Sequence, residues 1–152
     1  MTGIKTPVGI KIAGPDLAVQ PLLPNLLSRL GPGVCWYDLN GDGWEDLILP
    51  AARGGRLAVF INNGGKKFTF LAAAQINAGN QGAVLGWPDG LGNRQVLIAQ
   101  SNDEMPPGAD SRVSSLSDAI APREWPAGAA SLGPLAAADV DGDGDVDVFV
   151  GG

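Results

Sequence analysis

Two short stretches of the chain carry most of its acidic side chains, in an order that suits a hard cation. Nine of the 16 Asp and Glu residues lie within residues 38–46 and 139–147. In each stretch, oxygen-bearing side chains occupy positions 1, 3, 5 and 9, and glycines occupy positions 4 and 6. Calcium takes about six to eight oxygen ligands, and glycine permits the sharp bend that turns alternate residues toward one ion. The spacing therefore predicts two calcium sites.

The predicted ligands are the side chains at those four positions and the backbone carbonyl at position 7, with a water completing the shell. Magnesium fits less well, because it retains water and demands a small octahedron. Two bound calcium ions would bring the formal net charge of the chain from −6 to −2. A solvated acidic turn without metal is the alternative, and two copies in register argue against it. The ligand set is Asp38, Asn40, Asp42, Trp44 and Asp46 in the first loop, and Asp139, Asp141, Asp143, Asp145 and Asp147 in the second.

Position 12 of each stretch distinguishes these loops from a helix-flanked calcium site. An EF-hand requires a glutamate there and a helix on both sides. Here the residues are Leu49 and Val150, and both flanks are rich in β-forming residues. The loops are therefore expected to join neighbouring β-strands.

The loops belong to a longer internal repeat. Residues 33–50 align without gaps with residues 134–151, and residues 82–99 have the same shape halfway between them. The repeat period is therefore about 50 residues, in the range of propeller repeats. In the middle unit Pro88, Gly90 and Gly92 stand where acids would be, so no calcium site is predicted there.

Within one period the pattern predicts four short strands, at residues 33–37, 47–51, 56–61 and 67–71. The run Asn62-Asn63-Gly64-Gly65 is a strong hairpin signal, because Asn and Gly tolerate positive φ. Four antiparallel strands in about 40–50 residues are typical of a propeller blade. The expected fold is all-β, a partial propeller of about two and a half to three four-stranded blades.

Two parts of the chain give weaker signals. Residues 105–108 and 122–128 are expected to be long loops, and residues 114–120 either a strand or a short helical turn. Near the start, residues 9–13 suggest a strand, and residues 22–30 suggest a helical turn or an incomplete earlier blade.

The pattern Gly-x-Ala-x-x-Asp-x-Asp-Gly-Asp-Gly-x-x-Asp-hydrophobic-x-Val resembles the FG-GAP and VCBS-type repeats of integrin α-chain propellers and bacterial surface proteins. Residues 31–72 and 132–152 carry this resemblance well, and the hairpin at 62–65 is similar to the ASPIC/UnbV-like branch. The resemblance implies blades of four antiparallel strands, with calcium bound between the first two. The rings of such proteins usually have about seven blades.

Four segments follow from the repeat: an N-terminal segment or incomplete blade (1–30), a blade with a calcium loop (31–80), a degenerate blade (81–131) and the start of a third blade with a calcium loop (132–152). So few blades cannot close such a ring, and open sheet faces expose backbone and apolar surface. We therefore expect either a fragment of a longer protein or a homo-oligomer that completes the ring.

Composition excludes several classes of function. The absence of histidine excludes Ser-His-Asp and Cys-His catalytic sites within the chain and His-ligated zinc. The single cysteine, Cys35, cannot form an internal disulfide and is expected to be a buried strand thiol. No basic patch suits nucleic acid. No signal peptide is visible, and no apolar run approaches the ~20 residues of a membrane span.

The leading hypothesis is a non-catalytic binding or adhesion scaffold for a protein or glycan. Calcium sites of extracellular modules fill only at millimolar calcium, so the expected location is extracellular, at the cell surface or periplasmic. Trp36 and Trp87 fall in strand-like runs and are expected in the core, whereas Trp44 and Trp125 are candidates for stacking on a sugar.

Two alternatives remain open. The first is a fragment of a carbohydrate-active enzyme similar to polysaccharide lyases, for which Tyr37, Asp103, Glu104 and Arg112 are the available polar groups. Nothing in the sequence pairs them, so catalysis is not expected. The second is a purely structural segment of a large surface protein.

Overall fold

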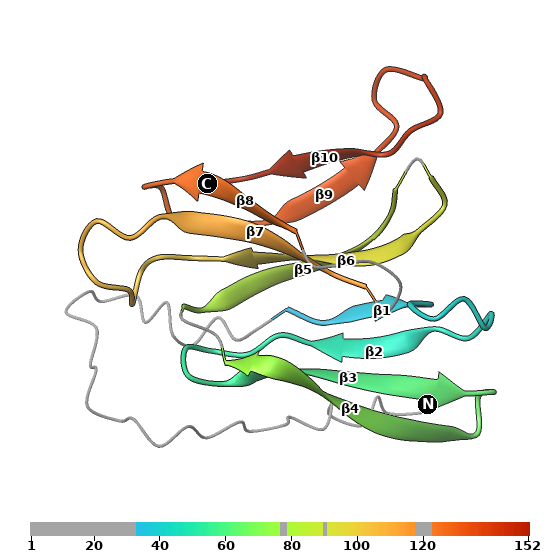
Figure 1. Ribbon diagram of the computed structural model, residues 1–152. Coiled ribbons are helices and arrows are strands. Elements are labelled where there is room, and N and C mark those ends of the chain that lie inside the picture. Colours follow the sequence, from blue (N-terminus) through green and yellow to red (C-terminus); the bar gives the residue numbers. More distant parts are fainter. Residues whose placement is uncertain (1–32, 77–78, 90, 118–122) are drawn as a thin grey trace, which may run out of the picture. The chain divides into compact units, whose positions relative to one another are not determined.

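The computed structural model describes residues 33–76, 79–89, 91–117 and 123–152. These residues form ten β-strands and no helix, in three antiparallel sheets (Figure 1). The predicted all-β class and the four-stranded antiparallel sheets are confirmed. The expected elements at residues 9–13 and 22–30 lie outside the described residues.

The first sheet contains the four strands predicted for one period, in sequential order: β1 (Cys35–Tyr37), β2 (Asp46–Leu49), β3 (Arg56–Asn63) and β4 (Lys67–Ile76). Residues of β2 alternate between buried and half-buried, as expected for a strand with two different faces. The last pair of the β3–β4 ladder is Asn63 with Lys67. Gly64 and Gly65 between them have φ of 67° and 72°, so the predicted hairpin is confirmed.

The second sheet has the same sequential order: β5 (Gln81–Pro88), β6 (Arg94–Gln100), β7 (Ser111–Leu116) and β8 (Glu124–Gly128). Of the range 114–120, for which the sequence allows a strand or a helical turn, residues 114–116 lie in strand β7, and residues 118–120 lie outside the described residues. The loop expected at 122–128 is wrong, because β8 pairs with β7. Pro126 is typical of a loop, but proline is also compatible with an edge strand, where its missing N–H faces away from the ladder. Strand β8 is the edge strand of this sheet.

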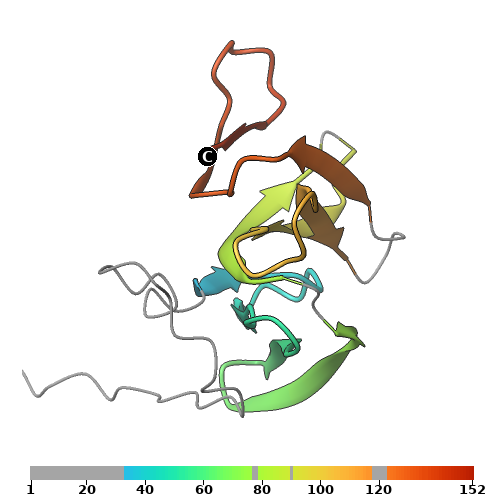
Figure 2. The same cartoon turned by 90° about the vertical axis from the view of Figure 1, so that its left-hand side faces the viewer.

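The third sheet is the hairpin β9 (Leu135–Ala138) and β10 (Asp147–Val150). Strand β5 contacts both β1 and β9, so the second sheet is packed between the other two (Figure 2). Burial on both faces accounts for β6, in which every residue from Gln95 to Gln100 is buried. The described residues include no helix of the length and hydropathy that a membrane span requires.

The core lies between the first and second sheets. Its buried members are Cys35, Leu39, Ile48, Leu57, Val59, Val96 and Ile98. Burial of the Cys35 thiol confirms the sequence prediction, and burial also raises its pKa.

Trp36 is not in this core, contrary to the prediction, and its side chain is 52% exposed. Side chains alternate across a strand, and Trp36 lies between Cys35 and Tyr37, which both face the second sheet. Trp87 is half-buried, and its indole N–H donates to the carbonyl of Val146 at 2.9 Å.

Candidate metal centres

The two acidic loops have the same backbone conformation. In each loop the carboxylate at position 1 accepts hydrogen bonds from the backbone N–H groups at positions 4 and 6: Asp38 from Gly41 and Gly43 at 2.8 and 3.0 Å, and Asp139 from Gly142 and Gly144 at 2.7 and 3.1 Å.

The remaining turns of the loops also correspond. The side-chain oxygen at position 3 accepts from the N–H at position 5, and that at position 5 accepts from the N–H at position 7. The glycines at position 6, Gly43 and Gly144, have φ of 86° and 93°, a region that side chains with a Cβ rarely adopt. The repeated spacing therefore produces the same bend twice.

The position 9 carboxylate ties the loop to its own start. Oδ2 of Asp46 accepts from the N–H of Leu39 at 3.0 Å, and Oδ2 of Asp147 accepts from the N–H of Val140 at 3.0 Å. In the first loop Oδ1 of Asp46 also accepts from the N–H of Asn62 at 2.8 Å. Asp46 is fully buried, whereas Asp147 is exposed. The four-stranded sheet thus supplies a second anchor that the two-stranded sheet lacks.

The second loop brings three carboxylates together. One oxygen from each of Asp139, Asp141 and Asp147 lies within 4.8 Å of the others. Carboxylates at this separation repel one another unless a cation or protons neutralise them. The predicted ligands Asp143 and Asp145 lie outside this group of three, and the side chain of Asp143 is hydrogen-bonded within the turn.

The first loop neutralises its acids differently. Position 3 is Asn40, which removes one charge. Nη1 of Arg94 lies 3.1 Å from Oδ2 of Asp38 and donates to the Asp38 carbonyl at 3.0 Å. Arg94 is the first residue of β6, so the neighbouring sheet places a positive charge on this loop.

The donor set fits calcium in both loops. Every side chain that the bend gathers offers oxygen, and the chain contains no histidine or second cysteine that would favour a softer metal. Position 1, position 3 and position 9 would hold the ion, and the ion would remove the repulsion among the carboxylates. This assignment is a prediction in both loops.

The middle turn closes without such a carboxylate set. Tyr37 pairs with Asp46 across the first hairpin, and Trp87 pairs with Gln95 across the corresponding hairpin of the second sheet. The intervening turn is therefore one residue shorter. Oδ1 of Asp89 accepts from the N–H groups of Leu91 and Asn93 at 3.0 and 2.8 Å.

The other carboxylate oxygen of Asp89 is also used. Oδ2 accepts from the side-chain amides of Asn93 and Gln95 at 2.8 and 3.1 Å. The Asn93 side chain, followed by the N–H groups of Asn93 and Leu91 and the Gln95 amide, holds the pKa of Asp89 below its ordinary value. All four donors come from the protein, so this turn has no need of a metal.

Three contributors were missed from the sequence: Arg94, Asn62 and Asp89. Arg94 lies 56 residues from Asp38, and no local pattern connects them. The Asn-Asn-Gly-Gly pattern predicts the turn that contains Asn62, but it does not predict the contact that the Asn62 side chain makes. Its side-chain amide donates to the Glu45 carbonyl at 3.1 Å and thereby ties the hairpin to the calcium loop.

The two tryptophans proposed for sugar stacking differ in their surroundings. Trp44 is half exposed, but its ring lies on the backbone of Gly65, where an added Cβ would be 2.5 Å from the ring atom Cζ3. The Trp44 ring therefore packs the loop against the hairpin. Trp125 lies on the edge strand β8 and is 39% exposed.

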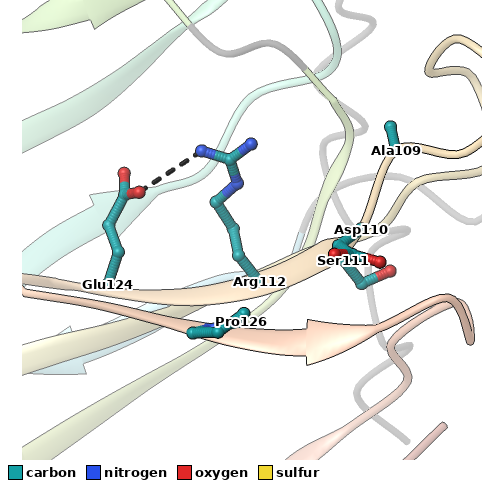
Figure 3. Close-up of a pocket in the computed structure, with 6 residues that line it drawn as sticks. All are labelled: Ala109, Asp110, Ser111, Arg112, Glu124 and Pro126. Carbon is teal, nitrogen blue, oxygen red and sulfur yellow. Dashed lines mark hydrogen bonds and ion pairs between the residues drawn. The ribbon is translucent and has the colours of Figure 1, made fainter.

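A hollow of about 420 Å³ lies beside β7 and β8 (Figure 3). Arg112 and Glu124 point the same way from these neighbouring strands, and Nη1 of Arg112 lies 3.3 Å from Oε2 of Glu124. Each charge is therefore already compensated by the other. Burial, partly opposed by Arg94, raises the pKa of Tyr37, which makes this phenol a weaker candidate for a catalytic base.

Comparison with known proteins supports the repeat. Residues 38–89, from the start of the first acidic loop to the turn of the second sheet, match the family model of the FG-GAP-like repeat. No curated protein and no solved structure gives a significant match. The resemblance is thereby confirmed at the level of the repeat, and its finer branch stays a prediction. Over residues 38–89, this chain is similar to FG-GAP-like repeats.

Proposed function

We propose that this chain is a calcium-stabilised β-propeller-type scaffold that binds one ion in each of the loops 38–46 and 139–147. The observation that carries the proposal is the correspondence of the two loops, 101 residues apart in the sequence, in their hydrogen bonds and their glycine φ angles. An FG-GAP-like repeat that begins at Asp38 supports the same assignment.

Calcium would act here as a structural staple. The acidic side chains are held close together by the bend, and an ion bound among them replaces repulsion by attraction. An ion that binds only the folded chain adds about 2.7 kcal/mol of stability when its concentration is ~100 times its dissociation constant. Both loops join the first two strands of a sheet, so binding would fix the hairpin from which that sheet is built.

The wider role that we propose is non-catalytic binding or adhesion outside the cytoplasm, with a protein or a glycan as ligand. Sites that fill at ~10⁻⁴–10⁻³ M calcium are suited to extracellular compartments. Trp125 is the better placed of the two tryptophans for a glycan, because the Trp44 ring is already packed against Gly65. Loss of glycan retention on Trp125→Ala would support this role, and retention by neither wild type nor variant would exclude a glycan.

Thermal unfolding in millimolar calcium, in millimolar magnesium and in chelator tests the staple. Calcium should raise the melting temperature by several degrees over chelator, at about 2–4 °C for each kcal/mol, and magnesium should raise it less. Asp139→Ala should remove part of the calcium effect. Asp103→Ala, in the turn after β6, is the matched control and should leave the calcium effect intact. Identical melting curves in calcium and chelator would contradict the proposal.

A further inference from the structure

Each sheet of this chain packs on the next one through the same pair of faces. In the first sheet, Cys35, Tyr37 and Ile48 lie on the face that packs against the second sheet, which we call the leading face. Trp36, Leu47, Phe60 and Phe70 pair across the four strands and share the opposite, trailing face, because paired residues point the same way.

The second sheet meets the first with its trailing face. Gly86 and Val96 pair across β5 and β6, and Val96 belongs to the core that contains Cys35 and Ile48. Leading face therefore packs on trailing face.

An aromatic residue crosses each of the two internal junctions. The ring of Tyr37 lies on Gly86, where an added Cβ would be 2.3 Å from Cδ2 of the ring. Trp87 holds the place of Tyr37 in the second sheet, and its indole N–H reaches the third sheet at Val146. In the third sheet, Ala137 occupies the position that Gly86 has in the second sheet. At the first junction a large leading residue thus packs on a small trailing residue, and at the second junction the corresponding positions are again large and small.

The two outer faces reverse these sizes. On the trailing face of the first sheet the position of Gly86 and Ala137 is occupied by Trp36, which is 52% exposed. On the leading face of the third sheet the position of Tyr37 and Trp87 is occupied by Ala138, which is exposed. A trailing tryptophan and a leading alanine are complementary in volume, as close packing of an interface requires.

Both outer faces also carry aromatic side chains around these positions, although on the third sheet the exposed Asp147, which pairs with Ala138, shares the leading face. Trp36 contacts Phe68 edge to face with ring centroids 6.1 Å apart, and Phe60 lies beside Phe70 with centroids 5.2 Å apart. Phe68, Phe70 and, on the leading face of the third sheet, Phe149 are exposed. Contiguous apolar surface of this kind marks an interaction site.

We propose that the leading face of the third sheet of one copy docks on the trailing face of the first sheet of a second copy. The contact continues between chains the stacking that exists within the chain, with Trp36 lying against Ala138. It is a head-to-tail contact that uses two different surfaces. A partner sheet with an aromatic residue at the leading position, as at both internal junctions, would overlap Trp36. The alanine of this chain leaves room for it.

Sedimentation velocity over about 1–500 μM protein, in millimolar calcium, tests the contact. The wild type should show an average mass above that of one chain, rising with concentration. Trp36→Gly empties the contact and Ala138→Tyr overfills it, so each should weaken association by about tenfold or more. Leu91→Ala removes an exposed apolar side chain from the turn between β5 and β6 and should associate as the wild type does.

The double variant Trp36→Gly/Ala138→Tyr is the decisive arm. It rebuilds the aromatic-on-small arrangement of the internal junctions, so it should recover the association that each single change loses. A single-chain mass at all concentrations, unchanged association in the single variants, or no recovery in the double variant would each overturn the proposal. Both positions are exposed in the single chain, and circular dichroism checks that each variant keeps its fold. Because Ala138 pairs with Asp147, the same samples are also compared in chelator, which separates association from calcium binding at the loop 139–147.

Discussion

The acidic loops 38–46 and 139–147 share one backbone and differ in their surroundings. The first lies on a four-stranded sheet, which buries Asp46 and adds a hydrogen bond from Asn62. It also forms an ion pair with Arg94, from the start of β6 in the neighbouring sheet. The second gathers three exposed carboxylates within 4.8 Å. The comparison teaches that a nine-residue spacing determines the bend, whereas neighbouring sheets determine how much of the negative charge is left for a metal to neutralise.

The largest expected effect separates the two position 9 carboxylates. In chelator, Asp46→Ala should lower the free energy of unfolding by about 3 kcal/mol, because the buried N–H of Leu39 and the part-buried N–H of Asn62 lose a charged acceptor. Asp147→Ala should lower it by less, since Asp147 is exposed and accepts one backbone hydrogen bond. Urea denaturation measures both, and Asp46→Asn, which keeps one acceptor oxygen, should fall between wild type and Asp46→Ala. Equal losses for Asp46→Ala and Asp147→Ala would remove the proposed difference between the loops.

A second effect of intermediate size concerns Arg94. Without calcium, Arg94→Ala should cost about 1 kcal/mol, the upper range for an exposed ion pair. With calcium, loss of the nearby positive charge should tighten binding at the first loop by about three- to tenfold. Calorimetric titration of the Asp139→Ala background isolates that loop. Arg112→Ala, which breaks the ion pair with Glu124, should leave the affinity unchanged. An unchanged affinity in Arg94→Ala would show that this charge does not compete with the ion.

The smallest expected effect lies in the middle turn. The folded-state pKa of Asp89 is lowered, first by the Asn93 side chain, so its contribution to stability is present above the ordinary carboxyl pKa of about 3.9. That contribution is lost as the pH falls through the lower folded value. Asp89→Asn should therefore flatten the acid limb of the stability profile slightly, and it should do so equally in calcium and in chelator. A calcium-dependent change would mean that this turn, too, takes part in metal binding.

Local patterns were sufficient for the repeat, the strands of the first sheet and the bends of both loops. Each of these depends on residues close in sequence: the alternation within a strand, the Asn-Asn-Gly-Gly turn, and the glycines that adopt positive φ. Residues 38–89 match the FG-GAP-like repeat in agreement with that pattern.

The features that were missed depend on contacts between sheets or on position within a sheet. The strand-like run around Trp36 predicts a core residue. The pairing of β1 with β2 shows instead that Trp36 lies on the face away from the second sheet. Arg94 reaches Asp38 across a junction that no spacing reveals. Pro126 is compatible with a strand only because β8 is an edge, and edge position follows from the order of strands in the sheet.

Calorimetric titration of the chelator-treated chain with calcium tests the central claim most directly. The account predicts two ions for each chain, one after Asp38→Ala and one after Asp139→Ala. No binding at millimolar calcium, or a stoichiometry that neither substitution changes, would contradict it.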